Sequence, residues 1–337
     1  MAQRGVGIFG ETPAEYLELA QQAESAGFHS IWSNELHRTA FVPLAAVAAR
    51  TSRIQLGTGV VLAFTRSPLI TALSALDLDE LAGGRLILGL GTGVQRLNED
   101  WHGVRYGKPV PHLRETVAVL RLFLDGLAKG RPIDFEGEYY NLHIRGYERH
   151  YPPVRERIPI VLGGVGPLMV RLAGEVGDGW LGHSLSSPEY LSRVIVPQLK
   201  AGLDRAGRSR QDFQIMPSVT VSIGRDAREA RRVAAGSIAF YATVRTYQSF
   251  FAFHGFESAL PPIQAAFKRG DIGAMIEAVP DEMIDAYTAA GTIDQVRARL
   301  AKYDETADVI RLVAAHQFVS PEETREQQRN ILDMLGQ

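Results

Sequence analysis

The chain has 337 residues, of which 45% are hydrophobic and 22% are charged, a balance typical of a soluble globular protein. Lys and Arg number 36 against 38 Asp and Glu, so the formal charge of −2 gives no electrostatic argument for binding nucleic acid or an anionic membrane. The absence of cysteine excludes disulfides, thiolate nucleophiles and Cys-ligated metals. No signal-peptide core follows Met1 and no apolar run approaches a membrane span, so a cytoplasmic protein is expected.

The first 32 residues predict a strand, a helix and a second strand. Residues 6–9 form a short apolar run that is typical of a buried strand. Thr12 and Glu15 have the spacing of a capping box at the start of a helix, and Gly27 is suited to end that helix. A second apolar strand follows from Ile31.

The same alternation continues along the chain and predicts a (β/α)₈ barrel. Further strands are expected at 54–61, 85–90, 158–162, 179–181, 213–222 and 309–314. Helices are expected to begin at Ser67-Pro68, Ser187-Pro188, Thr292 to Gln295 and Ser320 to Glu323, and another covers 168–176. With the first two strands the total is eight, the number in a closed TIM barrel. A doubly wound open sheet is the alternative, but the number of predicted strands favours one α/β barrel domain over residues 1–337.

Three segments do not fit the simple repeat and are predicted to be insertion loops. They cover about 92–110, 134–157 and 243–285, and the second includes a hairpin pattern around Phe135 to Tyr140. Long insertions in a compact barrel are usually lids or binding loops. The aromatic residues from Tyr247 to Phe256 suit either a lid over a planar cofactor or simple packing of the insertion onto the barrel.

Glycine-rich strand ends are the strongest pointers to a binding site. Residues that follow the carboxyl ends of barrel strands face the active site. Gly163 to Pro167 lies between an apolar strand and a helix, and the free N–H groups of that helix terminus suit a phosphate. The alternative is a tight turn without a ligand. The loop at 89–93 is also glycine-rich, but it lacks the acidic partner of a dinucleotide-binding fingerprint.

Polar residues follow the second predicted strand. Asn34, Glu35 and His37 could contact the polar edge of a ring or move a proton, or they could form an ordinary surface loop with a capping Asn. The histidines are scattered without the spacing of metal ligands, so no metal site is predicted. No nucleophile elbow or Walker loop is present in the sequence.

Taken together in order, several motifs resemble the bacterial luciferase-like superfamily, and within it the branch that uses the deazaflavin coenzyme F420. The motifs are Ala23 to Phe28 with Trp32, Ile54 to Val60 with Arg66-Ser67-Pro68, Gly84 to Gly93, Gly163 to Pro167 with Leu172 to Gly179, and Ala290 to Val296. They extend over nearly the whole chain. The resemblance implies a flavin or deazaflavin at the carboxyl mouth of the barrel, and a homodimer is often found in this superfamily.

The resemblance also implies particular roles for residues of this chain. It implies a non-prolyl cis peptide bond between Gly59 and Val60 behind the tricyclic ring, and a contact of Asn34 with the ring edge. The residues implied to bind the cofactor are Asn34, Gly59, Val60, Thr92, Gly93, Asn98, Gly163, Gly164, Val165 and Gly166, the last four at its phosphate.

Some positions depart from the relatives that act on glucose 6-phosphate. Those F420-dependent dehydrogenases have His where this chain has Glu35 and Glu where it has Val94, and this chain carries one extra residue before Asn98. These differences argue against that sugar-phosphate activity. Glu35 or His37 is predicted to transfer the proton.

The favoured function is hydride transfer between coenzyme F420 and a small organic substrate. The first alternative is an FMN-dependent monooxygenase that uses reduced flavin and oxygen. The second is a non-catalytic relative that binds a flavin-like ligand, and Val94 in place of an acidic residue is its best support.

Overall fold

The computed structural model describes residues 1–126, 130–147 and 149–336, and the chain forms two compact units. Unit 1 comprises residues 1–29, 182–197 and 215–337, and unit 2 comprises residues 30–181 and 198–214. Each unit therefore combines segments that are far apart in the sequence. A single domain over 1–337 stays a prediction. No helix in the described part of the chain has the length and apolar character needed to cross a bilayer.

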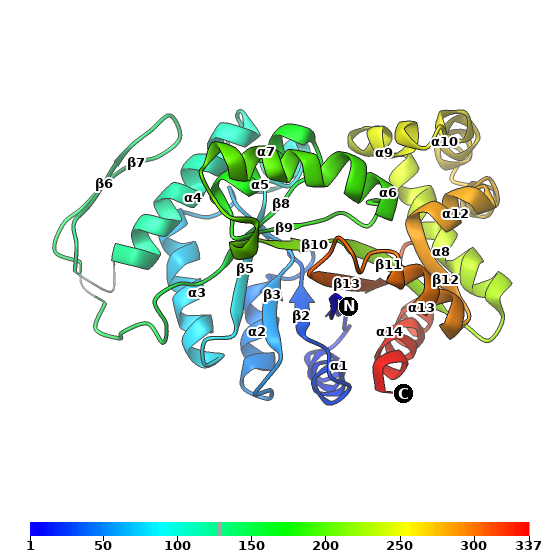
Figure 1. Ribbon diagram of the computed structural model, residues 1–337, viewed down its shortest axis with the longest axis horizontal. Helices are drawn as coiled ribbons and strands as arrows, with labels where there is room; N and C mark the ends of the chain where they lie inside the picture. The colour runs from blue at the N-terminus through cyan, green and yellow to red at the C-terminus, as the bar shows by residue number, and fades with distance from the viewer. Residues whose placement is uncertain (127–129, 148, 337) are drawn as a thin grey trace. The chain divides into compact units, whose positions relative to one another are not determined.

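Unit 1 is built on parallel strands in the order β1, β13, β11 and β12 (Figure 1). The strands are β1 (Gln3–Gly7), β11 (Ser218–Ile223), β12 (Thr288–Gly291) and β13 (Val309–Ala314). The helices are α1 (Pro13–Ser25), α6 (Pro188–Tyr190), a π-helical turn (Leu191–Ile195), α8 (Ala227–Ala242), α9 (Gln248–Phe253), α10 (Leu260–Lys268), α11 (Ile272–Glu277), α12 (Asp281–Tyr287), α13 (Ile293–Ala301) and α14 (Pro321–Gly336). The helix α7 (Val196–Arg205) and the strand β10 (Gln214–Met216) each have residues in both units.

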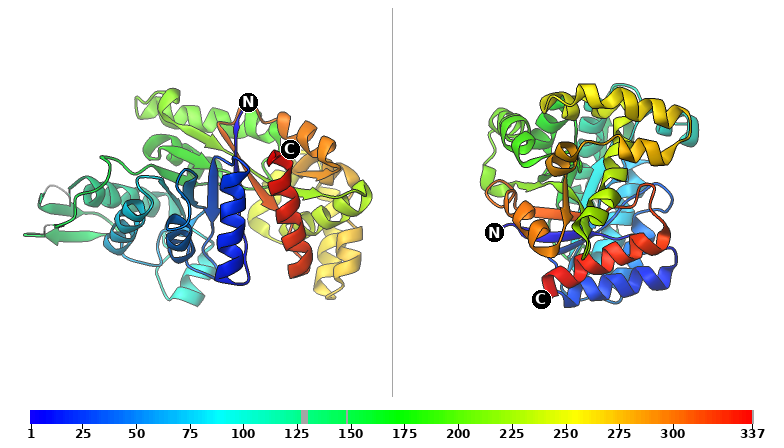
Figure 2. Two further views of the ribbon diagram at one scale, coloured as in Figure 1. Left: turned by 90° about the horizontal axis from the view of Figure 1, so that it is seen from below. Right: turned by 90° about the vertical axis from the view of Figure 1, so that its right-hand side faces the viewer.

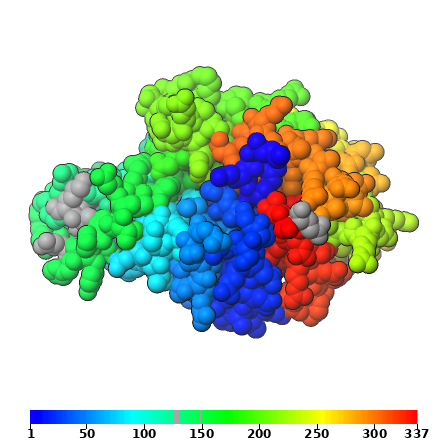
Figure 3. All heavy atoms as spheres, turned by 60° about the horizontal axis from the view of Figure 1, so that its bottom comes forward, coloured from blue at the N-terminus to red at the C-terminus, as the bar shows by residue number. Residues whose placement is uncertain are grey.

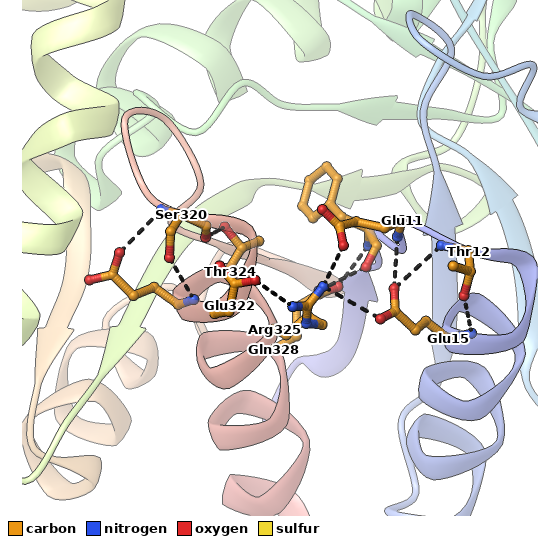
Figure 4. Close-up of polar contacts among 10 residues, drawn as sticks. Glu11, Thr12, Glu15, Ser320, Glu322, Thr324, Arg325 and Gln328 are labelled. Atoms are coloured by element: carbon orange, nitrogen blue, oxygen red, sulfur yellow. Dashed lines mark hydrogen bonds and ion pairs between the residues drawn. The ribbon is translucent and has the colours of Figure 1, made fainter.

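Helices α1 and α14 of unit 1 lie side by side in both views of Figure 2 and on the face shown in Figure 3. The capping box predicted at Thr12 is present, because Thr12 accepts from the Glu15 backbone N–H, and α14 begins with the same arrangement, in which Ser320 accepts from the Glu323 backbone N–H. Between the two helix starts, Arg325 of α14 forms ion pairs with Glu11 and Glu15 (Figure 4). Local capping therefore sets where each helix starts, and the arginine links the two starts.

Unit 2 contains parallel strands in the order β9, β8, β5, β3 and β2, with β4 also paired to β5. The strands are β2 (Ser30–Ser33), β3 (Gln55–Thr58), β4 (Val61–Leu62), β5 (Leu86–Gly91), β6 (Ile133–Glu136), β7 (Asn141–Ile144), β8 (Ile160–Gly163) and β9 (Gly179–Leu181). The helices are α2 (Phe41–Ala48), α3 (Pro68–Leu81), a π-helical turn (Leu97–Trp101), α4 (Pro109–Gly126) and α5 (Pro167–Val176).

Two predicted strands are interrupted in the structure. The strand expected at 54–61 divides into β3 and β4 around a cis peptide bond between Gly59 and Val60. The strand expected at 213–222 divides into β10 and β11 at Pro217, which has no N–H to donate to a neighbouring strand. The short strand β12 was not predicted, because its Thr-Ala-Ala-Gly sequence lacks the run of β-branched residues that signals a strand.

The insertions have ordered secondary structure. Strands β6 and β7 pair antiparallel, so the hairpin predicted in the second insertion is confirmed. The first insertion contains the π-helical turn at 97–101, and the third folds into the helices α9 to α12 rather than an irregular loop.

Candidate functional site

Three glycine-bearing strand ends of unit 2 meet around Val60. A Cβ atom built on Gly91, at the end of β5, would lie 2.6 Å from Val60 Cγ2. A Cβ atom on Gly163, at the end of β8, would lie 3.2 Å from Val60 Cγ1. Only residues without side chains leave room for the isopropyl group here. The ends of β3, β5 and β8 are therefore neighbours at one edge of the sheet.

The backbone around Val60 is fixed by hydrogen bonds to β2 and β5. The Gly59 N–H donates to the Ser33 carbonyl oxygen over 2.7 Å, and the Glu35 N–H donates to the Val60 carbonyl oxygen over 3.2 Å. Thr58 Oγ1 accepts from the Gly89 N–H at 2.7 Å. The cis peptide bond between Gly59 and Val60 that the family resemblance implies is thus present in a well-anchored segment.

The loop after β5 is organised by Asn98. This side chain is fully buried, and its Nδ2 donates to the carbonyl oxygens of Thr92 (2.8 Å) and Val94 (3.0 Å). Its Oδ1 is buried and accepts no hydrogen bond from the described residues. Gly93 has a φ of 63°, which suits glycine. A buried acceptor without a donor is uncommon in folded proteins.

A second side chain restrains the same loop. The Tyr106 hydroxyl group donates to the Gly93 carbonyl oxygen at 3.1 Å and lies 3.3 Å from Thr92 Oγ1. Its ring packs edge-on against Phe64, which follows β4. Tyr106 therefore connects the first insertion to the strand ends that surround Val60.

The loop from Gly163 to Gly166 leads into a helix without a side-chain cap. Gly166 is the N-cap of α5 and has no side chain to accept from the first backbone N–H groups of that helix. These N–H groups carry the positive end of the helix dipole and can bind an anion. The buried Trp180 of β9 donates from its indole N–H to the Gly164 carbonyl oxygen at 2.9 Å, which holds the loop in place.

The polar residues after β2 differ in their surroundings. Glu35 forms a two-pronged ion pair with Arg66, with one Nη1 to Oε2 distance of 2.9 Å, and Oε2 also accepts from the Leu62 N–H at 3.2 Å. Both carboxylate oxygens are thus engaged in holding the segment after β4. Asn34 and His37 are exposed.

All twelve predicted site residues lie in unit 2, and the contacts around Val60 and Thr92 bring several of them together. Sequence reasoning missed Trp180, Tyr106 and the role of Arg66. Trp180 was seen only as part of a predicted strand, and Arg66 only as part of a motif. Each acts through a contact across the fold that spacing along the chain does not encode.

No group of three or more His, Asp or Glu residues among the described residues is arranged to hold a metal ion.

Residues 2–308 match the family described as luciferase-like monooxygenase. The chain belongs to this family. It is 34% identical over 304 residues to an uncharacterized protein of Mycobacterium tuberculosis, covering 88% of this chain and 89% of that one. It is 31% identical over 310 residues to the 5,10-methylenetetrahydromethanopterin reductase of Archaeoglobus fulgidus, covering 89% and 90%.

Its structure is similar to that of the coenzyme F420-dependent tetrahydromethanopterin reductase from Methanopyrus kandleri. The TM-score is 0.85 at 25% identity, with 100% of this chain and 97% of the other covered. The predicted fold class, a luciferase-like (β/α)₈ barrel, is confirmed. The predicted enzyme class, a luciferase-like oxidoreductase, is confirmed at the level of the family.

Proposed function

We propose that this protein transfers a hydride between coenzyme F420 and a small organic substrate. The observation that carries the proposal is the meeting of three glycine-bearing strand ends around Val60, next to the uncapped N-terminus of α5. The chain is also 31% identical over 329 residues to a putative coenzyme F420-dependent oxidoreductase of Mycobacterium tuberculosis, and this similarity supports F420 over FMN.

The residues of the candidate site fit a flat molecule with a phosphate-bearing tail. The backbone N–H groups of Gly164, Val165 and Gly166 would bind the phosphate, because they directly precede α5, where the positive end of the helix dipole favours an anion. The buried Oδ1 of Asn98 would accept a hydrogen bond from the cofactor. Val60 would support the back of the ring. When bound, the deazaflavin supplies a carbon that accepts or donates a hydride.

The proton that accompanies the hydride needs a donor or acceptor on the protein. The ion pair with Arg66 and the hydrogen bond from the Leu62 N–H occupy both carboxylate oxygens of Glu35. These contacts favour a positioning role for Glu35. His37 is exposed and close in sequence to the ring-edge residue Asn34, so we assign the proton transfer to His37.

Homodimer formation and a cytoplasmic location stay predictions from the sequence.

Parallel titrations of the cofactor-free, full-length protein test the proposal. We expect F420 to bind at least about ten-fold more tightly than FMN. The reduced form of the bound cofactor should reoxidise slowly in air, because a deazaflavin reacts poorly with oxygen. Tight FMN binding with rapid reoxidation would instead establish the monooxygenase alternative. Cofactor binding without hydride exchange across alcohols, aldehydes, enones and methylene-pterins would establish the non-catalytic alternative.

A further inference from the structure

The second insertion of unit 2 packs against α4 through a stack of three rings. The imidazole ring of His112, on the first turn of α4, is buried at the centre of this stack. The Phe64 ring lies on one side of it, with centroids 3.7 Å apart and planes inclined by 3°. The Tyr139 ring lies on the other side, at 4.1 Å and 10°. The stack therefore joins the segment after β4, the helix α4 and the turn of the β6–β7 hairpin.

Tyr139 also holds the segment that leads into α4. Its hydroxyl oxygen accepts from the Lys108 N–H at 2.9 Å, and the Arg105 guanidinium group lies 5.3 Å from the centre of its ring. A Cβ atom on Gly107 would lie 2.6 Å from the same ring, and Gly107 has a φ of 64°, so glycine is needed there. The hairpin turn thus shapes the segment that contains Tyr106.

The hairpin turn is itself anchored to α4 by Glu115. The carboxylate of Glu115 accepts from the backbone N–H groups of Glu138 and Tyr139, each at 2.9 Å, and of Tyr140 at 3.3 Å. A Cβ atom on Gly137 would collide with Glu115 Oε2, so the turn closes directly over the carboxylate. Hydrogen bonds to an ionised acceptor are the stronger kind, and three of them fix the turn.

The two ring nitrogens of His112 have different partners. Nδ1 lies 3.0 Å from the Tyr106 carbonyl oxygen, which can only accept, so Nδ1 carries a proton and donates it. Burial lowers the pKa of His112, while the hydrogen bond to Tyr106 and the charge of Glu115 oppose this shift and the charge of Arg105 adds to it. The ring is therefore neutral at pH 7, and its Nε2 accepts from the Tyr140 hydroxyl group at 3.2 Å.

Tyr106 connects His112 to the loop after β5. His112 holds the Tyr106 backbone at its carbonyl oxygen, and the Tyr106 hydroxyl group donates to the Gly93 carbonyl oxygen at 3.1 Å. Gly93 and Thr92 belong to the loop that the buried Asn98 organises. A displacement of the Tyr106 backbone would therefore draw the hydroxyl group away from this loop.

We propose that His112 is a positioning residue for cofactor binding, which fixes the loop after β5 by donating from Nδ1 to the Tyr106 carbonyl oxygen. This inference rests on the proposed function and adds a residue to it. The β6–β7 hairpin supports the same hydrogen bond, because Tyr139 stacks on the imidazole ring and the Tyr140 hydroxyl group occupies Nε2. The second insertion therefore acts as a support for the cofactor loop.

Two variants separate the hydrogen bond of His112 from its packing. An Asn side chain places an amide N–H near the position of Nδ1 and a Gln side chain near that of Nε2, so only His112→Asn keeps the donor to Tyr106. We expect His112→Gln to bind F420 about five- to ten-fold more weakly than His112→Asn in a titration. Both variants lose the stacked ring, so a role in packing alone predicts equal affinities, and equal affinities in the two folded variants would overturn the inference.

A matched control and a double-mutant cycle test the route to the loop. His143→Gln replaces an exposed histidine of β7 outside these contacts and should leave the F420 affinity within about two-fold. In a protein that also carries Tyr106→Phe, the difference between His112→Asn and His112→Gln should fall below about two-fold, because the hydroxyl group that reaches Gly93 is gone. An undiminished difference would overturn the route through Tyr106.

Hydrogen exchange of the cofactor-free proteins separates this inference from the proposed function. Backbone amides from Thr92 to Asn98 should exchange faster in His112→Gln than in His112→Asn, and equal rates would overturn the positioning role whatever the F420 affinities. Faster exchange, together with a wild-type protein that does not bind F420, would support the hold of His112 on the loop and refute the hydride-transfer proposal.

The ring-nitrogen spectrum of the wild-type protein provides a measurement that needs no folded His112→Gln variant. The His112 signal is assigned from its absence in His112→Asn. We expect the proton of the neutral ring on Nδ1, as the hydrogen bond to Tyr106 requires. A proton on Nε2 instead would exclude that hydrogen bond and overturn the inference.

Discussion

A negative charge placed at the start of α5 should weaken cofactor binding strongly without destabilising the protein. Gly166 has extended backbone angles (φ −78°, ψ 154°) and nothing within 4 Å of the position of a Cβ atom, so a side chain fits there. In Gly166→Asp the new carboxylate would cap the helix at the N–H groups of Leu168 or Met169 and would place a negative charge beside the N–H groups assigned to the phosphate. Gly166→Asn provides the matched control, because it has nearly the same shape and caps equally well but carries no charge.

The magnitude follows from the distance between the two negative charges. At an effective dielectric constant of about 20, two unit charges about 5 Å apart repel by about 3 kcal/mol. This free energy corresponds to about a hundred-fold in affinity. Capping by Asp in place of Gly contributes only a few tenths of a kcal/mol, so the melting temperature should stay the same or rise slightly.

Thermal unfolding and F420 titration of the two variants provide the assay. We expect Gly166→Asp to bind F420 about 30- to 100-fold more weakly than Gly166→Asn, at equal or higher thermal stability. Equal F420 affinities in the two folded variants would show that the phosphate does not bind at this helix terminus. The reasoning about the uncapped start of α5 would then be wrong.

Three further predictions concern individual side chains of the protein. Trp180→Phe removes the donor to the Gly164 carbonyl oxygen and should weaken F420 binding about 5- to 30-fold in a titration; unchanged affinity would contradict the role of the indole N–H. Glu35→Gln breaks the ion pair with Arg66 and should lower the melting temperature without moving the pH profile of hydride transfer, whereas a shifted profile would make Glu35 the proton-transferring group. Burial lowers the pKa of His183 to about 3. The unfolded chain therefore binds this proton near pH 6.5 and the folded protein does not, so stability falls as the pH drops below about 6.5, by up to about 2 kcal/mol at pH 5. Thermal unfolding at pH 7.5 and pH 5 should show a smaller loss for His183→Gln, and an equal loss in both proteins would refute the assignment.

Local signals in the sequence predicted several of the helix starts. Thr12, Ser67, Ser187 and Thr292 all stand as N-caps in the structure, and the capping boxes at Thr12 and Thr292 are complete. Such signals are readable because the donor and acceptor lie within three residues of each other. Apolar runs likewise predicted the strands that carry the candidate site.

Features that depend on contacts across the fold could not be predicted from spacing. Glycines at 91 and 163 looked like flexible or phosphate-binding positions, but in the structure both make room for the side chain of Val60. The pairing of Glu35 with Arg66 joins residues 31 positions apart.

The structure of the complex with F420 tests the central claim most directly. We predict that the phosphate lies within hydrogen-bond distance of the backbone N–H groups of Gly164 to Gly166, with the ring against Val60 and a donor facing Asn98 Oδ1. A cofactor bound elsewhere, with these N–H groups and this oxygen facing only water, would contradict the account.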